Sequence, residues 1–162
     1  MTGIKLSILD QSPIISGHTP AQAEHETIRL ARAAEKLGYY RYWLAEHHSI
    51  AALADPCPEI LATHVAAATS TMRVGTGGVL LPYYSAFKVA EQFRMLEALY
   101  PGRIDLGIGR APGGDLPHGD LVEASRKGGR RAVRGHGQRA NRVVGVRGHF
   151  AEHGDRDWQL DL

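Results

Sequence analysis

Two adjacent histidines preceded by a glutamate, Glu46-His47-His48, are the residues of this sequence best suited to chemistry near neutral pH. Histidine titrates in that range and can donate or accept a proton. The tripeptide follows the aromatic, strand-like run 39–45, and parallel α/β enzymes place reactive side chains at the carboxyl ends of strands. The pattern therefore indicates proton transfer by His47, His48 or both.

Two other interpretations of the histidine pair stay open on the pattern alone. The first is a metal site, but adjacent histidines in an extended stretch point in opposite directions and rarely bind one ion together. We therefore predict no metal. The second is a pair of loop histidines that are satisfied by hydrogen bonds and have no function. The position at the end of a strand favours a functional role.

Two glycine-rich segments follow later strand-like runs. The segment 75–78, Gly-Thr-Gly-Gly, can bring the backbone close to a flat ligand, because glycine has no side chain. The segment 107–114 contains Arg110 and can hold a phosphate through backbone N–H groups and the guanidinium. Neither segment is a P-loop or a dinucleotide fingerprint. The alternative interpretation is an ordinary glycine-rich turn in one case and a loop with a surface arginine in the other.

The elements that must position these residues alternate between strand and helix. Strand-like runs cover residues 6–9, 39–45, 72–82 and 104–110. Helix signals begin at Thr19, after the loop 55–58, and at Ser85. The first helix is expected to end at Gly38 and to present one apolar face, made of Ile28, Ala31, Ala34 and Leu37.

This alternation predicts parallel strands joined by crossover helices. Four such strands fit either a doubly wound sheet or half of a (β/α)8 barrel. A complete barrel takes about 250 residues, and this chain has 162. The pattern alone slightly favours the doubly wound sheet, because it needs fewer strands.

The composition is that of a soluble globular chain, with 43% hydrophobic and 22% charged residues. The length suits one domain. A single cysteine, Cys57, excludes an internal disulfide and argues against a thiol-based zinc site. We expect no signal peptide in residues 1–10, and no apolar run is long enough to span a membrane. These features predict a cytoplasmic protein without a membrane partner.

The alternating pattern stops at Leu116. Ten basic and eleven acidic residues precede this point, whereas nine basic and six acidic residues follow it. The tail 116–162 is rich in Gly, Arg and His, and its one strand candidate contains Val143, Val144 and Val146. Little aliphatic surface predicts disorder, and the lack of a recognition motif predicts no nucleic acid partner. The expected organisation is a structured region, 1–115, and a disordered or out-of-frame tail, 116–162.

Taken together, the motifs resemble the luciferase-like flavin monooxygenase family, which includes bacterial luciferase (alkanal monooxygenase). The resemblance runs from about residue 4 to residue 115 and rests on the order and spacing of five stretches: 6–13 (LSILDQSP), 42–48 (YWLAEHH), 74–82 (VGTGGVLLP), 90–93 (AEQF) and 100–111 (YPGRIDLGIGRA). It implies the N-terminal half of a TIM-type (β/α)8 barrel, with about four parallel strands and three helices, instead of the doubly wound sheet.

The resemblance also implies the chemistry. The family uses reduced FMN as cosubstrate and O2 as oxidant to oxidise an aldehyde or another small organic molecule. A separate reductase is expected to supply the flavin, and a homodimer is expected to pair through the second and third helices. An F420-dependent oxidoreductase is the alternative, because a related branch shares the barrel. A non-catalytic half-barrel that binds flavin weakly or acts as an interaction module is a further alternative.

Several residues acquire roles from the resemblance. His47 matches the catalytic histidine beside the flavin, where it supports proton transfers, and His48 is its neighbour. Arg110 matches a contact to the FMN phosphate. Glu91 matches an acidic position on the third helix that we expect to be buried and structural.

The third-strand glycines match a segment that lies along the isoalloxazine ring of the flavin. This assignment makes Thr76, Gly77 and Gly78 cofactor-binding residues. The family often has a non-proline cis peptide bond in this segment, and we predict it at Gly77-Gly78.

The chain departs from the family pattern after the fourth strand. Four parallel strands cannot close, so the first and fourth strands are expected to present unpaired edges. The other half of a barrel would supply further phosphate contacts and most of the substrate pocket. The sequence therefore predicts a truncated copy, active or inactive, with weak flavin affinity and low stability as a monomer.

Overall fold

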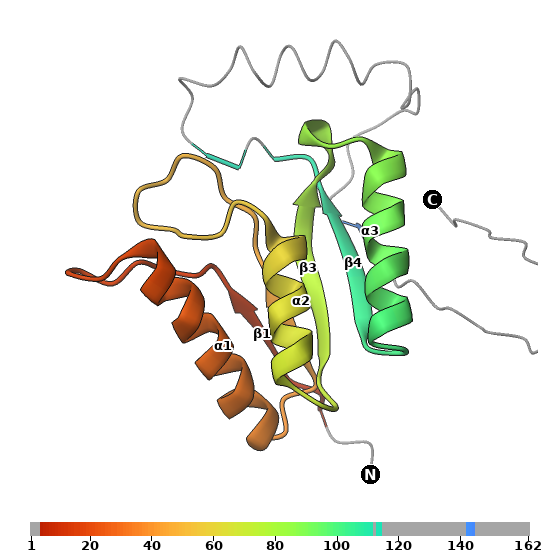
Figure 1. The fold of residues 1–162 in the computed structure, drawn as a ribbon, viewed down its shortest axis with the longest axis horizontal. Coiled ribbons are helices and arrows are strands. Elements are labelled where there is room, and N and C mark those ends of the chain that lie inside the picture. The colour runs from red at the N-terminus through yellow and green to blue at the C-terminus, as the bar shows by residue number, and fades with distance from the viewer. Residues whose placement is uncertain (1–3, 112, 115–141, 145–162) are drawn as a thin grey trace, which may run out of the picture.

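A computed structural model of the chain describes residues 4–111, 113–114 and 142–144 (Figure 1). Strands and helices alternate along the first part: β1 (Ser7–Asp10), α1 (Pro20–Lys36), β2 (Arg41–Leu44), α2 (Pro58–Ala68), β3 (Arg73–Leu80), the 3-10 turn η1 (Leu81–Tyr83), α3 (Ala86–Leu99) and β4 (Ile104–Gly109). A short strand, β5 (Arg142–Val144), follows in the tail. The sheet order is β1-β2-β3-β4-β5, and the first four strands are parallel.

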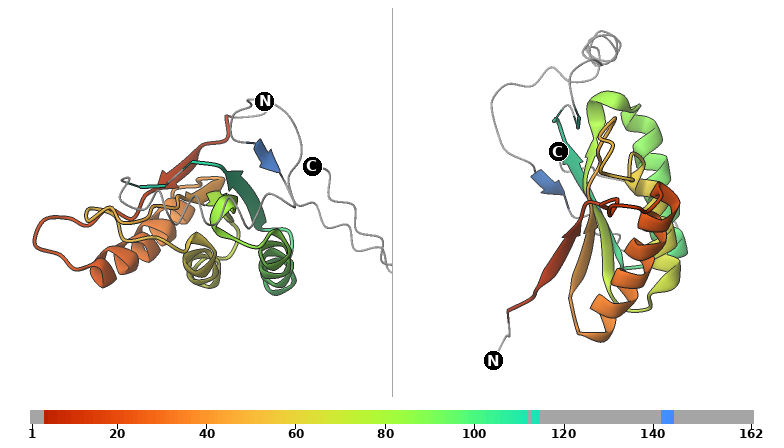
Figure 2. Two further views of the ribbon diagram at one scale, coloured as in Figure 1. Left: turned by 90° about the horizontal axis from the view of Figure 1, so that it is seen from above. Right: turned by 90° about the vertical axis from the view of Figure 1, so that its left-hand side faces the viewer.

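All three α-helices cover one face of the sheet, as the two views of Figure 2 show. A doubly wound sheet has helices on both faces, whereas a (β/α)8 barrel keeps them outside the strands. Sequential strand order and one helical layer therefore confirm the predicted N-terminal half of a TIM-type barrel. The weaker expectation of a doubly wound sheet is wrong.

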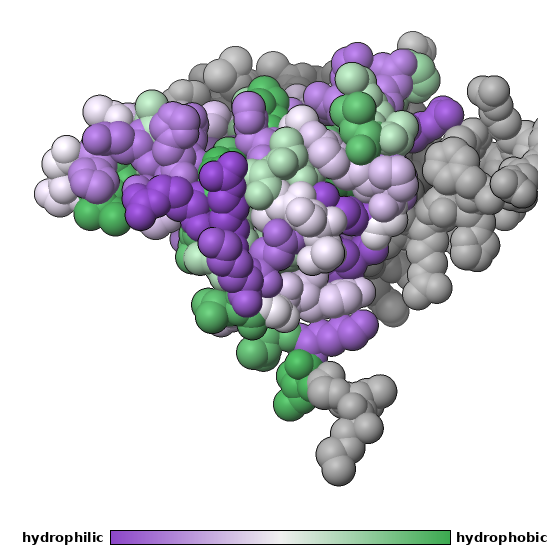
Figure 3. All heavy atoms as spheres, turned by 60° about the horizontal axis from the view of Figure 1, so that its bottom comes forward, coloured by the Kyte–Doolittle hydropathy of each residue, from purple (hydrophilic) through white to green (hydrophobic). Residues whose placement is uncertain are grey.

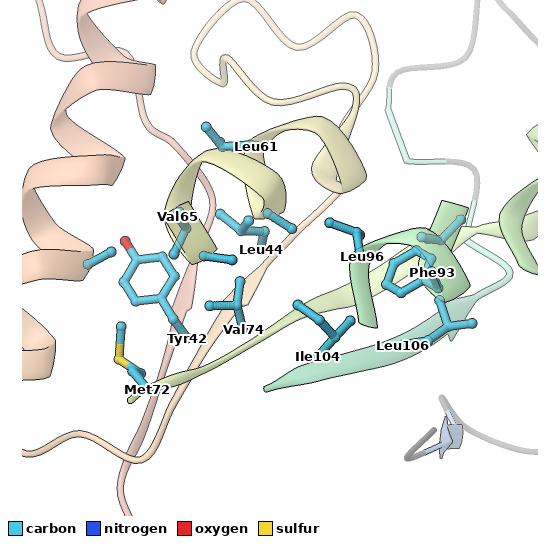
Figure 4. Close-up of a cluster of buried hydrophobic side chains, with 14 of the residues drawn as sticks. Tyr42, Leu44, Leu61, Val65, Met72, Val74, Phe93, Leu96, Ile104 and Leu106 are labelled. Atoms are coloured by element: carbon cyan, nitrogen blue, oxygen red, sulfur yellow. The ribbon is translucent and has the colours of Figure 1, made fainter. Parts of the chain in front are cut away.

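The core lies between the sheet and this helical layer. Ile8, Tyr42, Val74 and Ile104 are aligned in register across the four parallel strands, and the last three are buried. Figure 4 shows how Tyr42, Val74, Ile104 and neighbouring strand residues meet the inward faces of α2 and α3, which contribute Leu61, Val65, Phe93 and Leu96. Alternate strand residues point to the other face.

The helix ends follow the local sequence signals. Thr19 forms a capping box with Gln22, and Ser85 accepts a hydrogen bond from the amide of Lys88. Gly38 has a φ of +81°, the left-handed conformation that follows many helices. These side chains and turns act locally, so the starts of α1 and α3 and the stop of α1 were predicted correctly.

The predicted apolar face of α1 is wrong at one position. Leu37 is 77% exposed, because it follows the last helical turn and no longer points at the sheet. It lines a hollow of about 570 Å3 with Leu6, Tyr40 and Met72. This hollow lies at the amino ends of the strands, and apolar surface gathers at the lower edge of Figure 3, beside the N-terminal residues.

The prediction that the fourth strand has an unpaired edge is also wrong. Arg142–Val144 pairs antiparallel with β4, with Leu106 opposite Val144 and Ile108 opposite Arg142. An unpaired strand edge presents N–H and C=O groups that any extended segment can satisfy. Val146 and the remainder of the predicted disordered tail lie outside the described residues. The outer edge of β1 has no strand partner within the described part of the chain.

A charge cluster lies on the sheet face that the helices leave open. Asp105, which is 2% exposed, lies 2.7 Å from Nε of Arg41 and 2.7 Å from Nη2 of Arg73. Because these residues come from β2, β3 and β4, the cluster joins three strands near their amino ends. Trp43 lies on the same face, with the Arg41 guanidinium 4.9 Å from its ring.

Among the described helices, none combines the length and the apolar character needed to cross a bilayer.

Candidate active site

The segments that follow β2, β3 and β4 meet at the carboxyl ends of these strands, in the upper part of Figure 1. Two hydrogen bonds join them. The amide of Leu80 at the end of β3 donates to Glu46 at 2.8 Å, and the amide of His48 donates to the carbonyl oxygen of Gly113 at 2.7 Å. The structure therefore brings the histidine pair, the end of the glycine-rich strand and the segment after β4 together.

Glu46 is buried directly after β2, with 4% of its surface exposed. One carboxylate oxygen accepts from Leu80, the other lies 2.6 Å from Nε2 of His48, and the Tyr84 hydroxyl also donates to the group. Burial raises the pKa of Glu46, and these hydrogen bonds oppose part of that rise. The sequence motif alone assigns Glu46 no role of its own. Its burial depends on tertiary packing, which the motif does not reveal.

His48 is fixed on three sides. Its Nε2 is engaged by Glu46, its amide is bound to Gly113, and its ring centroid lies 4.7 Å from that of Tyr83. About 30% of the side chain is exposed. These contacts leave His48 little freedom to approach a ligand.

His47 has a different environment. Its amide donates to the carbonyl oxygen of Asp55 at 3.0 Å, but its buried Nδ1 has no hydrogen-bond partner among the described residues. Burial, together with the nearby His48, lowers the pKa of His47. The imidazole is therefore neutral near pH 7 and can accept a proton.

Asp55 is a buried acid that the sequence interpretation missed, because Asp55-Pro56 was read as a loop signal. Burial raises its pKa to about 7, and the charges of Glu59 and Glu46 add to the rise. One carboxyl oxygen accepts from the Cys57 amide at 3.0 Å, whereas Oδ2 has no partner in the described part of the chain. Asp55 therefore shares the loop that holds His47 in place.

The third strand carries an irregularity at its glycines. The register between β3 and β4 shifts between Thr76 and Val79, and the Gly77-Gly78 peptide bond is cis, at the predicted position. Gly77 is exposed on the open face of the sheet. A Cβ atom placed there would come within 3.1 Å of Leu9 and 3.4 Å of Trp43. The backbone at Gly77 thus offers a bare, flat surface bordered by apolar side chains.

Thr76 is placed differently from the two glycines that follow it. Its side chain is fully buried, and its hydroxyl donates to the carbonyl oxygen of Gly107 at 3.1 Å. A Cβ at Gly107 would overlap the backbone of Thr76, so the two strands approach too closely for a larger residue there. The Thr76 hydroxyl therefore stabilises the β3–β4 contact, and the residue presents no exposed surface to a ligand.

Arg110 is exposed in the segment that follows β4. This segment returns to the histidine loop through the bond between Gly113 and His48. A Cβ at Gly114 would overlap the carbonyl oxygen of His48, so the approach requires glycine. Arg110 is thus an exposed cation at the carboxyl end of the sheet.

Glu91 contradicts the expectation of burial. It is exposed, and its carboxylate lies 3.2 Å from Nζ of Lys88. The helix buries Val89, Phe93 and Leu96, so position 91 falls on the opposite side. The buried acid of α3 is Glu97, which accepts from the Gly102 amide at 2.7 Å.

Within the described residues, no group of three or more His, Cys, Asp or Glu side chains is placed to hold a metal ion.

Known proteins resemble this chain in sequence. YceB of Bacillus subtilis (strain 168) is 60% identical over 111 residues, which cover 68% of this chain and 34% of YceB. N-acetyl-S-alkylcysteine monooxygenase of the same organism is 51% identical over 124 residues, covering 76% of this chain and 37% of that protein. The chain therefore spans about a third of the length of the curated relatives that it matches.

Solved structures resemble it in fold. Apo-MsnO8 is 54% identical, with a TM-score of 0.70 over 76% of this chain and 36% of its own. Two more distant structures show the fold alone. The oxygenating constituent of 3,6-diketocamphane monooxygenase from Pseudomonas putida, in complex with FMN, is 23% identical (TM-score 0.66, 74% of this chain and 32% of that one). An F420-dependent secondary alcohol dehydrogenase is 19% identical, with a TM-score of 0.50 over 85% of this chain and 46% of its own.

The family comparison covers most of the chain. A family model described as luciferase-like monooxygenase matches residues 4–141. This range includes the histidine pair, the β3 glycines and Arg110, and it extends past the end of β4. The chain belongs to the luciferase-like monooxygenase family.

Proposed function

We propose that this chain carries the flavin side of the active site of a monooxygenase, which uses reduced FMN and O2 to oxidise an aldehyde or another small organic molecule. A separate reductase would supply the flavin. One observation carries the proposal. The exposed backbone of Gly77 lies in β3 next to Thr76, which is paired with Leu44 at the end of β2, and His47 with its unpartnered Nδ1 follows Leu44 by three residues.

The residues at this end of the sheet fit a flavin. A planar ring system needs a surface without side chains, and Gly77 offers one beside Trp43 and Leu9. A phosphate needs a cation that is free to reach it, and Arg110 is exposed in the segment after β4. Gly78 would contribute its backbone, and the buried Thr76 would act by fixing the strand next to Gly77. We assign the ring to Gly77 and Gly78, and the phosphate to Arg110.

The proton chemistry belongs to His47. Reduced FMN, when bound, supplies the two electrons that activate O2. A neutral His47 can accept a proton at the unpartnered Nδ1 and return it, because burial lowers its pKa and keeps the imidazole unprotonated near pH 7. The Trp43 and Leu9 side chains border Gly77 and would limit the access of water to the ring face of the flavin.

The test is oxygen-dependent turnover of reduced FMN by the purified chain. His47→Ala should slow turnover roughly a hundredfold or more, the usual contribution of a positioned acid–base group. His64→Ala removes an exposed histidine of α2 and should leave the rate unchanged. Equal rates for the chain and for His47→Ala would contradict the role of His47. An absence of any turnover above free FMN would contradict the oxygenase assignment for this chain.

F420-dependent oxidoreduction is the second candidate, because an F420-dependent dehydrogenase has the same fold. Direct titration separates the two cofactors. The proposal predicts that FMN binds more tightly than F420, since we assign Arg110 to the single terminal phosphate of FMN. Tighter binding of F420 would reverse the assignment.

We also propose that two copies pair through α2 and α3. Ile60 on α2 and Phe87 and Met95 on α3 are 58%, 74% and 66% exposed, and a contact between two copies through these helices would bury them. Analytical ultracentrifugation should detect a dimer, and Phe87→Asp should shift the population toward monomer. A monomer at every concentration would contradict the proposal.

A further inference from the structure

Glu46 and His48 together connect the ends of three strands. Glu46 follows β2 and accepts from the amide of Leu80, the last residue of β3. His48 lies 2.6 Å from the Glu46 carboxylate and donates its amide to Gly113 in the segment after β4. The Glu46 side chain, the His48 ring and the His48 amide therefore link the loop of His47, the end of the glycine-rich strand and the segment of Arg110.

The partners of Glu46 distinguish it from the other buried glutamates among the described residues. A carboxylate that is removed from water needs several hydrogen bonds to offset the loss of hydration. Glu46 has three partners, from Leu80, His48 and Tyr84. Glu59 and Glu97 are also buried, but each keeps one oxygen without a partner among the described residues. Glu46 therefore has more hydrogen-bond partners than the other two, whose carboxyl groups are only partly satisfied.

The same contacts hold His48 in place, so its side chain is not available for proton exchange with a ligand. Glu46 engages its Nε2, Tyr83 packs near its ring, and Gly113 holds its amide. His47 lies between these two fixed residues and keeps its Nδ1 free. The structure therefore separates the roles of two histidines that the sequence treated alike.

We propose that Glu46 and His48 are positioning residues, which act as one unit to hold His47 and the Arg110 segment at a fixed place relative to the β3 glycines. His47 is the residue that exchanges protons. This inference rests on the proposed flavin function of the site, but the linkage itself can be measured without flavin.

The first measurement is amide hydrogen exchange on the complete 162-residue chain. Glu46→Gln keeps the shape of the side chain but removes the charge that Leu80 and His48 contact. Exchange at the Leu80 amide should become at least about tenfold faster, because its hydrogen bond to a charged group is lost. Exchange at the His48 amide should also become faster, because the His48 ring loses the carboxylate that holds it while the amide is bonded to Gly113. Glu59→Gln is the matched control, since it makes the same change at a buried acid that is 9% exposed and joins no strand ends. It should leave both amides unchanged.

The second measurement is FMN affinity by quenching of flavin fluorescence. Glu46→Gln and His48→Phe should each weaken FMN binding about tenfold, because either change breaks the same link. The His48→Phe side chain keeps an aromatic ring against Tyr83 but has no Nε2. The double variant should bind FMN no more weakly than the worse single variant. This double cycle remains informative if one variant is less stable, and the imidazole NMR signals of His47 should shift in both.

Three outcomes overturn the proposal: unchanged exchange at Leu80 and His48 in Glu46→Gln, unchanged FMN affinity despite faster exchange, or additive losses in the double variant. Failure of the proposed function has a different signature. In that case the wild-type chain binds no FMN, and the exchange data alone decide whether Glu46 holds the three strand ends together.

Discussion

The amide of His48 donates a hydrogen bond to the carbonyl oxygen of Gly113 at 2.7 Å, so the segment after β4 is attached directly beside His47. The next residue, Gly114, lies so close that a Cβ there would overlap the carbonyl oxygen of His48. Two backbone contacts thus set the distance between the proposed acid–base residue and the segment that carries Arg110. The approach depends on glycine at position 114.

Gly114→Ala should disturb the site through this contact. The added methyl cannot fit against the His48 backbone, so the segment must move and the Gly113 bond must lengthen. We expect a loss of roughly 1–3 kcal/mol in the free energy of unfolding, the usual cost of overpacking, together with severalfold weaker FMN binding. Urea denaturation and flavin fluorescence measure the two effects.

Gly38→Ala provides the control for that substitution. Gly38 has nothing within 4 Å of its Cβ position, but its φ of +81° makes alanine costly by about 1 kcal/mol. It lies at the amino ends of the strands, so FMN affinity should not change. If both alanine variants bind FMN as tightly as the wild type does, FMN binding does not depend on the close approach of the segment after β4 to His48.

Asp55 predicts a pH dependence of stability. Its pKa is about 7 in the folded chain, against 3.8 for the free side chain. Between these values the unfolded chain releases a proton that the folded chain retains, so the free energy of unfolding falls as pH rises. Asp55→Asn cannot ionise and should escape this loss. The variant should be more stable than wild type by up to roughly 4 kcal/mol above pH 7 and about equal to it near pH 4.

Urea titrations at a series of pH values test that prediction. Asn can still accept from the Cys57 amide, so the loop geometry is retained. Glu26→Gln changes an exposed acid of α1 and should show no such pH-dependent difference. A constant difference between Asp55→Asn and wild type across the range would show that Asp55 is ionised in the folded chain.

Asp105 should contribute to the stability of the fold but should not contact the flavin. Asp105→Asn removes the charge that Arg41 and Arg73 share, and both arginines are about three-quarters buried. We expect a loss of about 2–4 kcal/mol, because two partly desolvated cations are left without a counter-charge. Glu91→Gln breaks the exposed pair with Lys88 and should cost less than about 0.5 kcal/mol. Similar melting temperatures for the two variants would contradict the structural role of the cluster.

Much of the fold could be predicted from local signals. The cap residues Thr19 and Ser85 and the stop at Gly38 act on their own neighbours, so they can be read from a single sequence. The alternation of strands and helices gave the parallel sheet. It could not decide between a barrel half and a doubly wound sheet, because that choice depends on which face the crossover helices cover. The family resemblance decided it.

The errors have a common cause. Leu37 and Glu91 were assigned to buried positions, but one lies past the end of α1 and the other on the outer side of α3. A shift of one or two residues along a helix moves a side chain to a different face. The pairing of β5 with β4 was not predicted either, because its partner is far away in the sequence.

The candidate site was predicted in part. The histidine pair, the glycines of β3 and Arg110 stand out by residue type, and the resemblance located the cis bond at Gly77-Gly78. The roles of Glu46 and Asp55 could not be read, because both follow from burial and from partners on other strands. The cluster around Asp105 was missed for the same reason, since it requires the register of three strands.

The most direct test of a flavin site at these strand ends is a parallel fluorescence titration of the chain with FMN and with riboflavin, which lacks the phosphate. The account predicts saturable quenching by both, with FMN bound at least about tenfold more tightly through Arg110. Arg110→Gln should abolish that difference, and Gly77→Val should weaken both ligands. No saturable quenching, or equal affinity of the wild-type chain for FMN and riboflavin, would contradict the account.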